Sequence, residues 1–147
     1  MINDVYITEA CRTAVGNMGG ALKNVQPVEL ATCVVKGVLD RSETDSAMID
    51  EVVLGHCRQS SENPNIARIA SLKAGIPVGI PAYTVMRQCA SGMTAICSEA
   101  MAIMCGQHDI AIAGGVESMS TAPFYIMGVR YGLGTGSTKL LDSITEA

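Results

Sequence analysis

Short apolar segments alternate with helix-like segments through most of this 147-residue chain. Three helices are predicted between the apolar segments. The first covers residues 27–40, which carry apolar side chains at helical spacing. The second starts at Pro64-Asn65 and stops at Gly75, and the third runs from about Ala90 to Met104. The apolar segments themselves have the length of strands, and they comprise residues 5–7, 52–54, 82–85 and 110–113. The order predicts β-α-β-α-β-α-β, an α/β fold with a layered sheet and right-handed crossovers.

Two segments depart from simple amphipathic patterns. The segment from Ala90 to Met104 has Glu99 as its only charged residue, which predicts a helix buried in an interior. From Ser118 onward the periodicity is lost, and only residues 140–144 suggest the start of another helix. Residues 132–136 resemble a dinucleotide-binding fingerprint, but no apolar strand precedes them, so we predict a loop there.

Composition narrows the classes of function. Apolar residues make up 48% of the chain, enough for a packed core, and the net charge of −4 with no basic patch argues against a nucleic-acid partner. There is no charged leader followed by an apolar stretch and no 18-residue apolar run, so neither secretion nor membrane spanning is predicted and a cytoplasmic location is expected. The six cysteines include no C-x-x-C pair and the two histidines are far apart, which predicts neither a disulfide framework nor a metal site.

Cys89 is the candidate catalytic residue. It stands where the strand-like segment ends and the apolar helix begins, and the free N–H groups of a first helical turn favour a thiolate over a thiol. Ser91 and Gly92 keep that turn small, and Arg87 offers either a nearby positive charge or an ordinary ion-pair partner. This placement predicts acyl transfer through a covalent thioester, against the alternative of a buried structural cysteine.

Several separated motifs resemble the thiolase family. They are Arg87-Gln88-Cys89-Ala90-Ser91-Gly92-Met93, Ala113-Gly114-Gly115-Val116-Glu117-Ser118-Met119-Ser120, Arg12-Thr13-Ala14-Val15-Gly16, Asn65-Ile66-Ala67-Arg68 and Lys139-Leu140-Leu141-Asp142-Ser143. The chain is similar to the N-terminal half of an acetyl-CoA acetyltransferase over essentially its whole length. One departure is Met86, where the family usually has Asn or another small polar residue, so a hydrogen-bonding group near the nucleophile is lost.

The resemblance implies a thiolase-like layered fold, with residues 1–117 as the N-terminal thiolase-type α/β domain and residues 118–147 as the beginning of a loop region. It implies reversible Claisen condensation of acetyl-CoA to acetoacetyl-CoA through an acetyl thioester on Cys89, with coenzyme A thioesters as substrates and no cofactor. In the family an acid–base Cys, a His and an Asn come from a second half, and none of their motifs occurs here. We therefore expect a separate C-terminal half as partner, and an oligomer with the strand before Cys89 at its two-fold interface.

The remaining polar candidates have ordinary explanations. His56 and His108 are expected to be surface or loop histidines, and Glu117 to anchor a loop by capping N–H groups; Ser118 and Ser120 are treated like Glu117. The rival function is a non-catalytic assembly subunit or inactive fragment, favoured by Met86 and the missing acid–base residues. A ketoacyl-synthase-like condensing enzyme fits the Cys at a helix start but not the run after Gly114. A lone half is also expected to leave an apolar sheet face uncovered.

Overall fold

A computed structural model describes residues 3–146. Its helices are α1 (Pro27–Ser42), α2 (Ile66–Ala74) and α3 (Ser91–Met104), with single 3-10 turns η1 (Ser46–Met48) and η2 (Met119–Thr121). Its strands are β1 (Glu51–Gly55), β2 (Ala82–Val85), β3 (Ala111–Gly115), β4 (Phe124–Tyr125) and β5 (Leu141–Asp142). No helix among residues 3–146 is both long and apolar enough to cross a membrane.

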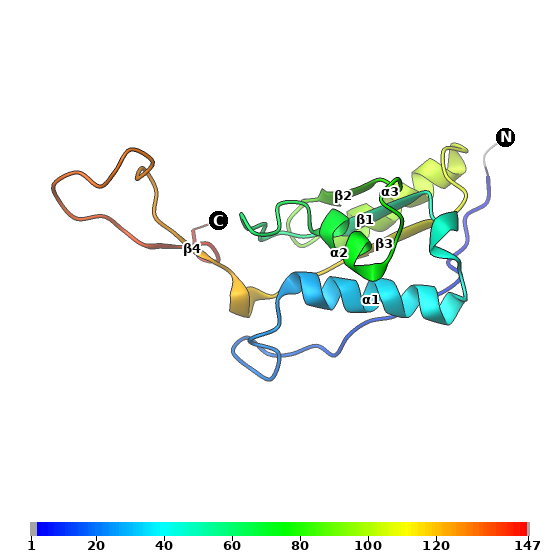
Figure 1. The fold of residues 1–147 in the computed structure, drawn as a ribbon, viewed down its shortest axis with the longest axis horizontal. Coiled ribbons are helices and arrows are strands. Elements are labelled where there is room, and N and C mark those ends of the chain that lie inside the picture. Colours follow the sequence, from blue (N-terminus) through cyan, green and yellow to red (C-terminus); the bar gives the residue numbers. More distant parts are fainter. Residues whose placement is uncertain (1–2, 147) are drawn as a thin grey trace.

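The body of the chain is a parallel sheet with strand order β2-β1-β3 (Figure 1). In its register Val53 of β1 lies opposite Tyr83 of β2 and Ala113 of β3. Because parallel neighbours need a crossover, α2 connects β1 to β2 and α3 connects β2 to β3. The α/β class predicted from the sequence is confirmed, and all three carboxyl ends of the strands meet at one edge of the sheet.

Helices cover both faces of the sheet. Successive side chains of a strand point to opposite faces: Val52 and Leu54 join the core formed with α1 and α2, whereas Val53, also fully buried, lies outside that core cluster. α2 packs on β1 and β2, α1 packs on α2, and α3 packs against all three strands. Val53 therefore faces α3, and the central strand is buried on both sides.

The helix ends follow from local chemistry. Pro27 occupies the first position of α1, and the Glu29 carboxylate accepts a 2.8 Å hydrogen bond from the Gln26 N–H in a capping box. In α2 the Asn65 side chain accepts a hydrogen bond from the Arg68 N–H, and Gly75 ends the helix in the left-handed conformation. These start and stop positions are the ones the sequence predicts.

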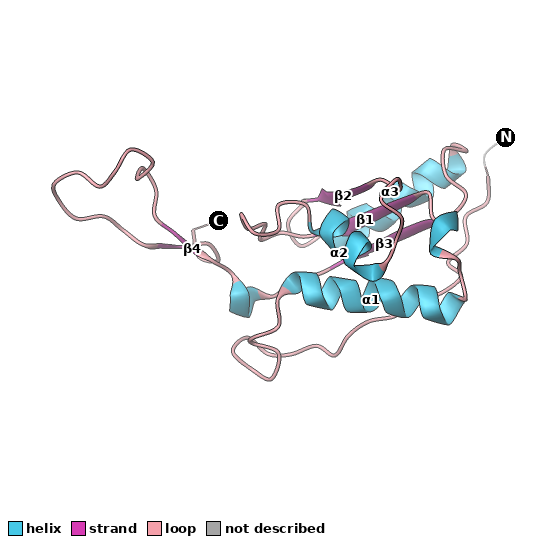
Figure 2. Cartoon of the chain, in the orientation of Figure 1, coloured by secondary structure: helices cyan, strands magenta, loops and turns pink. Residues whose placement is uncertain are grey.

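Three local predictions are wrong. Residues 5–7 do not form a strand, since they lie in a loop segment without sheet pairing (Figure 2). The side chains of Tyr6 and Ile7 are largely exposed. Residues 140–144 form no helix, because Leu141–Asp142 pairs antiparallel with Phe124–Tyr125. β4 and β5 close a long arm that projects away from the body of the chain (Figure 1).

The third wrong prediction concerns α3. Its buried residues are Ser91, Ala95 and Glu99, while Met93, Ile96, Met101 and Met104 are at least 39% exposed. The helix lies on the sheet as a single outer layer, so only one side of it can be buried by the described residues. The predicted uncovered apolar sheet face is not found, because helices cover both faces of the sheet, and the exposed apolar side chains lie on α3 instead.

Candidate active site

Cys89 lies in the turn between β2 and α3, at the carboxyl edge of the sheet. α3 begins at Ser91 with Ala90 as its N-cap, so Cys89 precedes the helix by two residues. The residue is exposed and lies outside the named strands. The structure thus puts Cys89 where the sequence predicts it, next to the N-terminal end of a helix and open to solvent.

Glycines allow the helix to start this close to the sheet. A Cβ on Gly55, the last residue of β1, would lie 2.3 Å from the Ser91 carbonyl carbon, and one on Gly115 would lie 3.1 Å from the Gly92 Cα. Real Cβ atoms do not come that close to backbone, so no other residue fits at Gly55 without movement. The first turn of α3 is therefore seated directly on the ends of β1 and β3.

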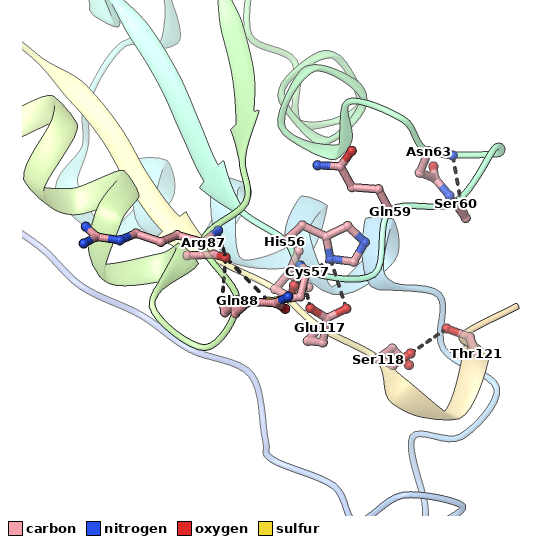
Figure 3. A network of polar contacts seen from close by, with 12 residues as sticks. His56, Cys57, Gln59, Ser60, Asn63, Arg87, Gln88, Glu117, Ser118 and Thr121 are labelled. Carbon is pink, nitrogen blue, oxygen red and sulfur yellow. Dashed lines mark hydrogen bonds and ion pairs between the residues drawn. The ribbon is translucent and has the colours of Figure 1, made fainter. Parts of the chain in front are cut away.

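A polar network centred on one buried histidine lies beside this turn (Figure 3). His56 follows β1, is 2% exposed, and its Nδ1 is 2.9 Å from the Val116 carbonyl oxygen. Because a carbonyl only accepts, this nitrogen carries the hydrogen and donates to Val116. Glu117 Oε1 is 3.2 Å from the same nitrogen, an electrostatic contact since the hydrogen points to Val116, and Glu117 Oε2 accepts a 2.8 Å hydrogen bond from the Cys57 N–H.

These contacts test two sequence predictions. Glu117 holds a backbone N–H of the opposite loop, so its predicted loop-anchoring role is confirmed. His56 is predicted to be a surface or loop histidine, and it is a loop histidine directly after β1 that is buried rather than on the surface. The signal was present in the sequence: His56 directly continues the buried run Val52–Gly55.

Two cavities border the network. One, of about 480 Å³, is lined by Cys57, Met86, Tyr125, Met127 and Leu141 among others, and we call it the Met86 cavity. Cys57 also contacts the Gln88 carbonyl, so this cavity lies beside the turn that carries Cys89. The other, of about 500 Å³, lies between the extended N-terminal segment, α1 and the residues after β3, including Glu117 and Ser118. Met86 is 54% exposed and contributes to the lining of the Met86 cavity.

A cluster of titratable side chains lies at the opposite end of the sheet, where β1 begins at Glu51. His108 Nδ1 is 2.9 Å from Glu99 Oε2, and His108 Nε2 is 3.9 Å from Glu51 Oε2. Burial, then the neighbouring Glu99 charge, raise the pKa of Glu51 above its ordinary value of 4.5, although His108 acts in the opposite direction. One ring nitrogen and two carboxylate oxygens within 4.8 Å of one another are ligand types that transition metals accept. Sequence reasoning missed the cluster because its members come from three separate segments.

Comparison with known proteins identifies the family. Residues 5–147 match the family model described as "Thiolase, N-terminal domain". The chain is 42% identical over 145 residues to the acetyl-CoA acetyltransferase of Pseudomonas aeruginosa and 47% identical over 130 residues to a beta-ketoadipyl-CoA thiolase of the same organism, covering 99% and 87% of this chain. The crystal structure of the Bacillus anthracis acetyl-CoA acetyltransferase matches 99% of the chain with a TM-score of 0.94 and 43% identity.

The chain belongs to the thiolase family and is similar to its N-terminal domain, as the sequence motifs indicate. It spans 37% of the length of the Pseudomonas aeruginosa acetyltransferase, 32% of the thiolase from that organism, and 37% of the Bacillus anthracis chain.

Proposed function

We propose that this chain is the nucleophile-bearing part of an acetyl-CoA C-acetyltransferase, with Cys89 as the acyl-accepting residue. The observation that carries the proposal is the exposed position of Cys89 at the N-terminal end of α3. The Cys89 thiolate attacks the carbonyl carbon of acetyl-CoA, a C–S bond to Cys89 forms, and the bond to the coenzyme A sulfur breaks as that thiolate leaves. No cofactor takes part, since the substrate is already an activated thioester.

Cys105 provides an internal comparison for Cys89. Both thiols are exposed, but Cys105 is the C-cap of the same helix, where the partial charge is negative. Thiolate, not thiol, reacts with iodoacetamide, so we expect Cys89 to be labelled roughly tenfold faster than Cys105 at neutral pH.

The test is peptide mass spectrometry after brief exposure to acetyl-CoA or iodoacetamide, with the Cys89→Ala variant as control. Acetylation of Cys89 alone supports the proposal. Equal labelling of the exposed cysteines Cys33, Cys89, Cys97 and Cys105 contradicts it.

The second step needs a base, and within residues 3–146 neither histidine is placed to act on a substrate at Cys89. Condensation requires removal of a proton from a second acetyl-CoA and donors for the oxyanions. The chain has two histidines: His56 is buried against Val116 and Glu117, and His108 lies at the far edge of the sheet. We therefore propose that a C-terminal thiolase half, the portion of the relatives outside this chain, supplies the acid–base groups.

The outer face of α3 is the proposed contact with that half. At 100° per residue, Met93, Ile96, Met101 and Met104 fall within an arc of about 140°, which forms one apolar stripe. The match covers 37% of the length of each of these relatives, so nearly two-thirds of their polypeptide lies outside it, enough for a second layer over this stripe. We expect residues 118–147, whose described part includes the projecting arm, to be the beginning of the loop region, and residues 1–117 to be the N-terminal domain.

A complementation assay tests the partner. The chain is mixed with the remaining C-terminal portion of the Bacillus anthracis enzyme, and thiolysis of acetoacetyl-CoA is followed. We expect turnover in the mixture alone, its loss with Ile96→Glu, and no loss with Leu72→Glu, an exposed apolar residue of α2. Absence of turnover with every mixture would favour the rival function, a non-catalytic assembly subunit, to which Met86 and the lack of a nearby base already point.

We further propose that the assembled protein is an oligomer. β2, the strand before Cys89, is at one edge of the sheet, so its outer backbone groups are available for pairing with a second copy. A monodisperse monomer by light scattering at assay concentration would contradict this proposal.

A further inference from the structure

Gln88, the residue before Cys89, has an unusual backbone conformation. Its φ is +49°, in the left-handed region that a residue with a Cβ rarely adopts. Among the described residues only Glu43 shares this property without being glycine, and Glu43 is the C-cap of α1, where a left-handed residue is common. Gln88 has no such helix end behind it, so its conformation must be held by contacts.

The contacts converge on the Gln88 carbonyl oxygen. It accepts a 2.6 Å hydrogen bond from the Ser91 hydroxyl, a 3.0 Å hydrogen bond from the Ser91 N–H and a 2.8 Å contact from the Cys57 thiol. The Ser91 hydroxyl oxygen in turn accepts a 2.8 Å hydrogen bond from the Arg87 N–H. Ser91 thus closes the turn from both sides.

Both donors are fixed in place. Ser91 is 3% exposed and lies over Gly55, which leaves its backbone no room to shift toward β1. The Cys57 N–H is held by Glu117, which contacts the buried His56 (Figure 3). The left-handed residue is therefore attached to the ends of β1 and β3 through two donors, the Ser91 hydroxyl and the Cys57 thiol, whose oxygen and sulfur atoms are 3.5 Å apart.

We propose that Ser91 is a positioning residue for Cys89, with the Cys57 thiol as a second donor. By holding Gln88 left-handed, the pair keeps Cys89 at the N-terminal end of α3, where free N–H groups stabilise a thiolate. The role matters for catalysis only if the proposed function holds, but it concerns the reactivity of Cys89 and is measured without acyl transfer.

Ser71 offers a matched control. It is 1% exposed, and its hydroxyl donates to the Arg68 carbonyl three residues earlier, the same arrangement as Ser91 with Gln88. It lies on α2, so Ser71→Ala removes an equivalent buried hydrogen bond away from Cys89.

The experiment measures iodoacetamide alkylation of Cys89 against pH in the full chain by peptide mass spectrometry, with Cys105 as reference. Ser91→Ala removes the hydroxyl's hydrogen bonds with the Gln88 carbonyl and the Arg87 N–H, and we expect it to slow alkylation of Cys89 at neutral pH by roughly 3- to 10-fold and to move its pH profile upward. Ser71→Ala should leave the Cys89 profile unchanged. A wild-type profile in folded Ser91→Ala, or an equal shift in Ser71→Ala, overturns the proposal.

A second pair of variants tests the positioning of Cys89 if Ser91→Ala does not fold. Cys57→Ser keeps a donor to Gln88 and should retain the wild-type profile, whereas Cys57→Ala should slow Cys89 alkylation by roughly 2- to 5-fold. Equal profiles for these two variants overturn the proposal. Slowed alkylation in a chain that acetyl-CoA never acetylates would support the positioning role while contradicting the proposed function.

Discussion

The two helical layers of this chain differ in what they bury. α1, which has Glu29, Lys36, Asp40 and Arg41 along its length, buries a continuous apolar side against α2 and the sheet. α3 has one charged residue and yet leaves most of its large apolar side chains exposed. The comparison shows that apolar content sets how much surface a helix could bury, whereas the number of layers around it sets how much it does bury.

Two isoleucines test this comparison most strongly. Ile66 of α2 is fully buried in the core and Ile96 of α3 is 39% exposed. We expect Ile66→Ala to lower the free energy of unfolding by about 3 kcal/mol, since a cavity is left behind, and Ile96→Ala to lower it by less than about 1 kcal/mol. Urea unfolding followed by circular dichroism measures both, and similar losses would show that α3 is covered in solution.

The contact between α3 and β1 is the next target. Because a Cβ on Gly55 would overlap the Ser91 backbone, we expect Gly55→Ala to cost about 1–3 kcal/mol of unfolding free energy. Gly79 is the control, since a Cβ there meets no atom within 4 Å, and Gly79→Ala should change stability by at most about 1 kcal/mol. Wild-type stability in Gly55→Ala would mean that the first turn of α3 is not seated on the sheet as described.

The smallest expected effect concerns the other end of α3, where Glu51 of β1 meets Glu99. The folded-state pKa of Glu51 is raised, mainly by burial, because the folded chain favours the protonated carboxyl. The contribution of Glu51 to the free energy of unfolding is therefore complete below its ordinary pKa of 4.5 and is lost as pH rises through the raised value. At neutral pH the ionised Glu51 therefore opposes folding. We expect Glu51→Gln to raise the free energy of unfolding at pH 7 by less than about 1 kcal/mol, seen as a higher urea midpoint, and to have no effect near pH 4.

Asp50, the preceding residue, should respond in the opposite sense. Hydrogen bonds from the Ile110 and Asp109 N–H groups lower the pKa of Asp50 below its ordinary value of 3.8. Its contribution is present above pH 3.8 and is lost as pH falls through the lowered value, so Asp50→Asn should destabilise the chain at pH 7 and become neutral in acid. The same pH dependence in both variants would contradict the described cluster.

Much of the fold follows from local sequence. Pro27, Asn65 and Gly75 mark helix ends because each supplies a backbone or capping property that operates within a few residues. The strand at 82–85 and the position of Cys89 before a helix follow in the same way. By contrast, residues 5–7 alternate as a strand should but have no pairing partner among the described residues, and a strand needs one to satisfy its backbone.

The candidate site also contains some features that local sequence predicts and others that depend on distant residues. Cys89 could be selected from sequence because its significance depends on the helix that follows it. The burial of His56 and the approach of Cys57 to the Gln88 carbonyl depend on residues about 30 to 60 positions apart, and no local pattern encodes such contacts. The cluster of Glu51, Glu99 and His108 was missed for the same reason.

The sequence by itself determined the order of helices and strands from α1 to β3, the helix ends and the family, because caps, periodicity and motifs act through neighbouring residues. Only the tertiary structure decided which apolar surfaces are buried and which polar groups meet at the two edges of the sheet. Burial and long-range hydrogen bonds depend on which segments pack together, and here the layer over α3 is not formed by the described residues.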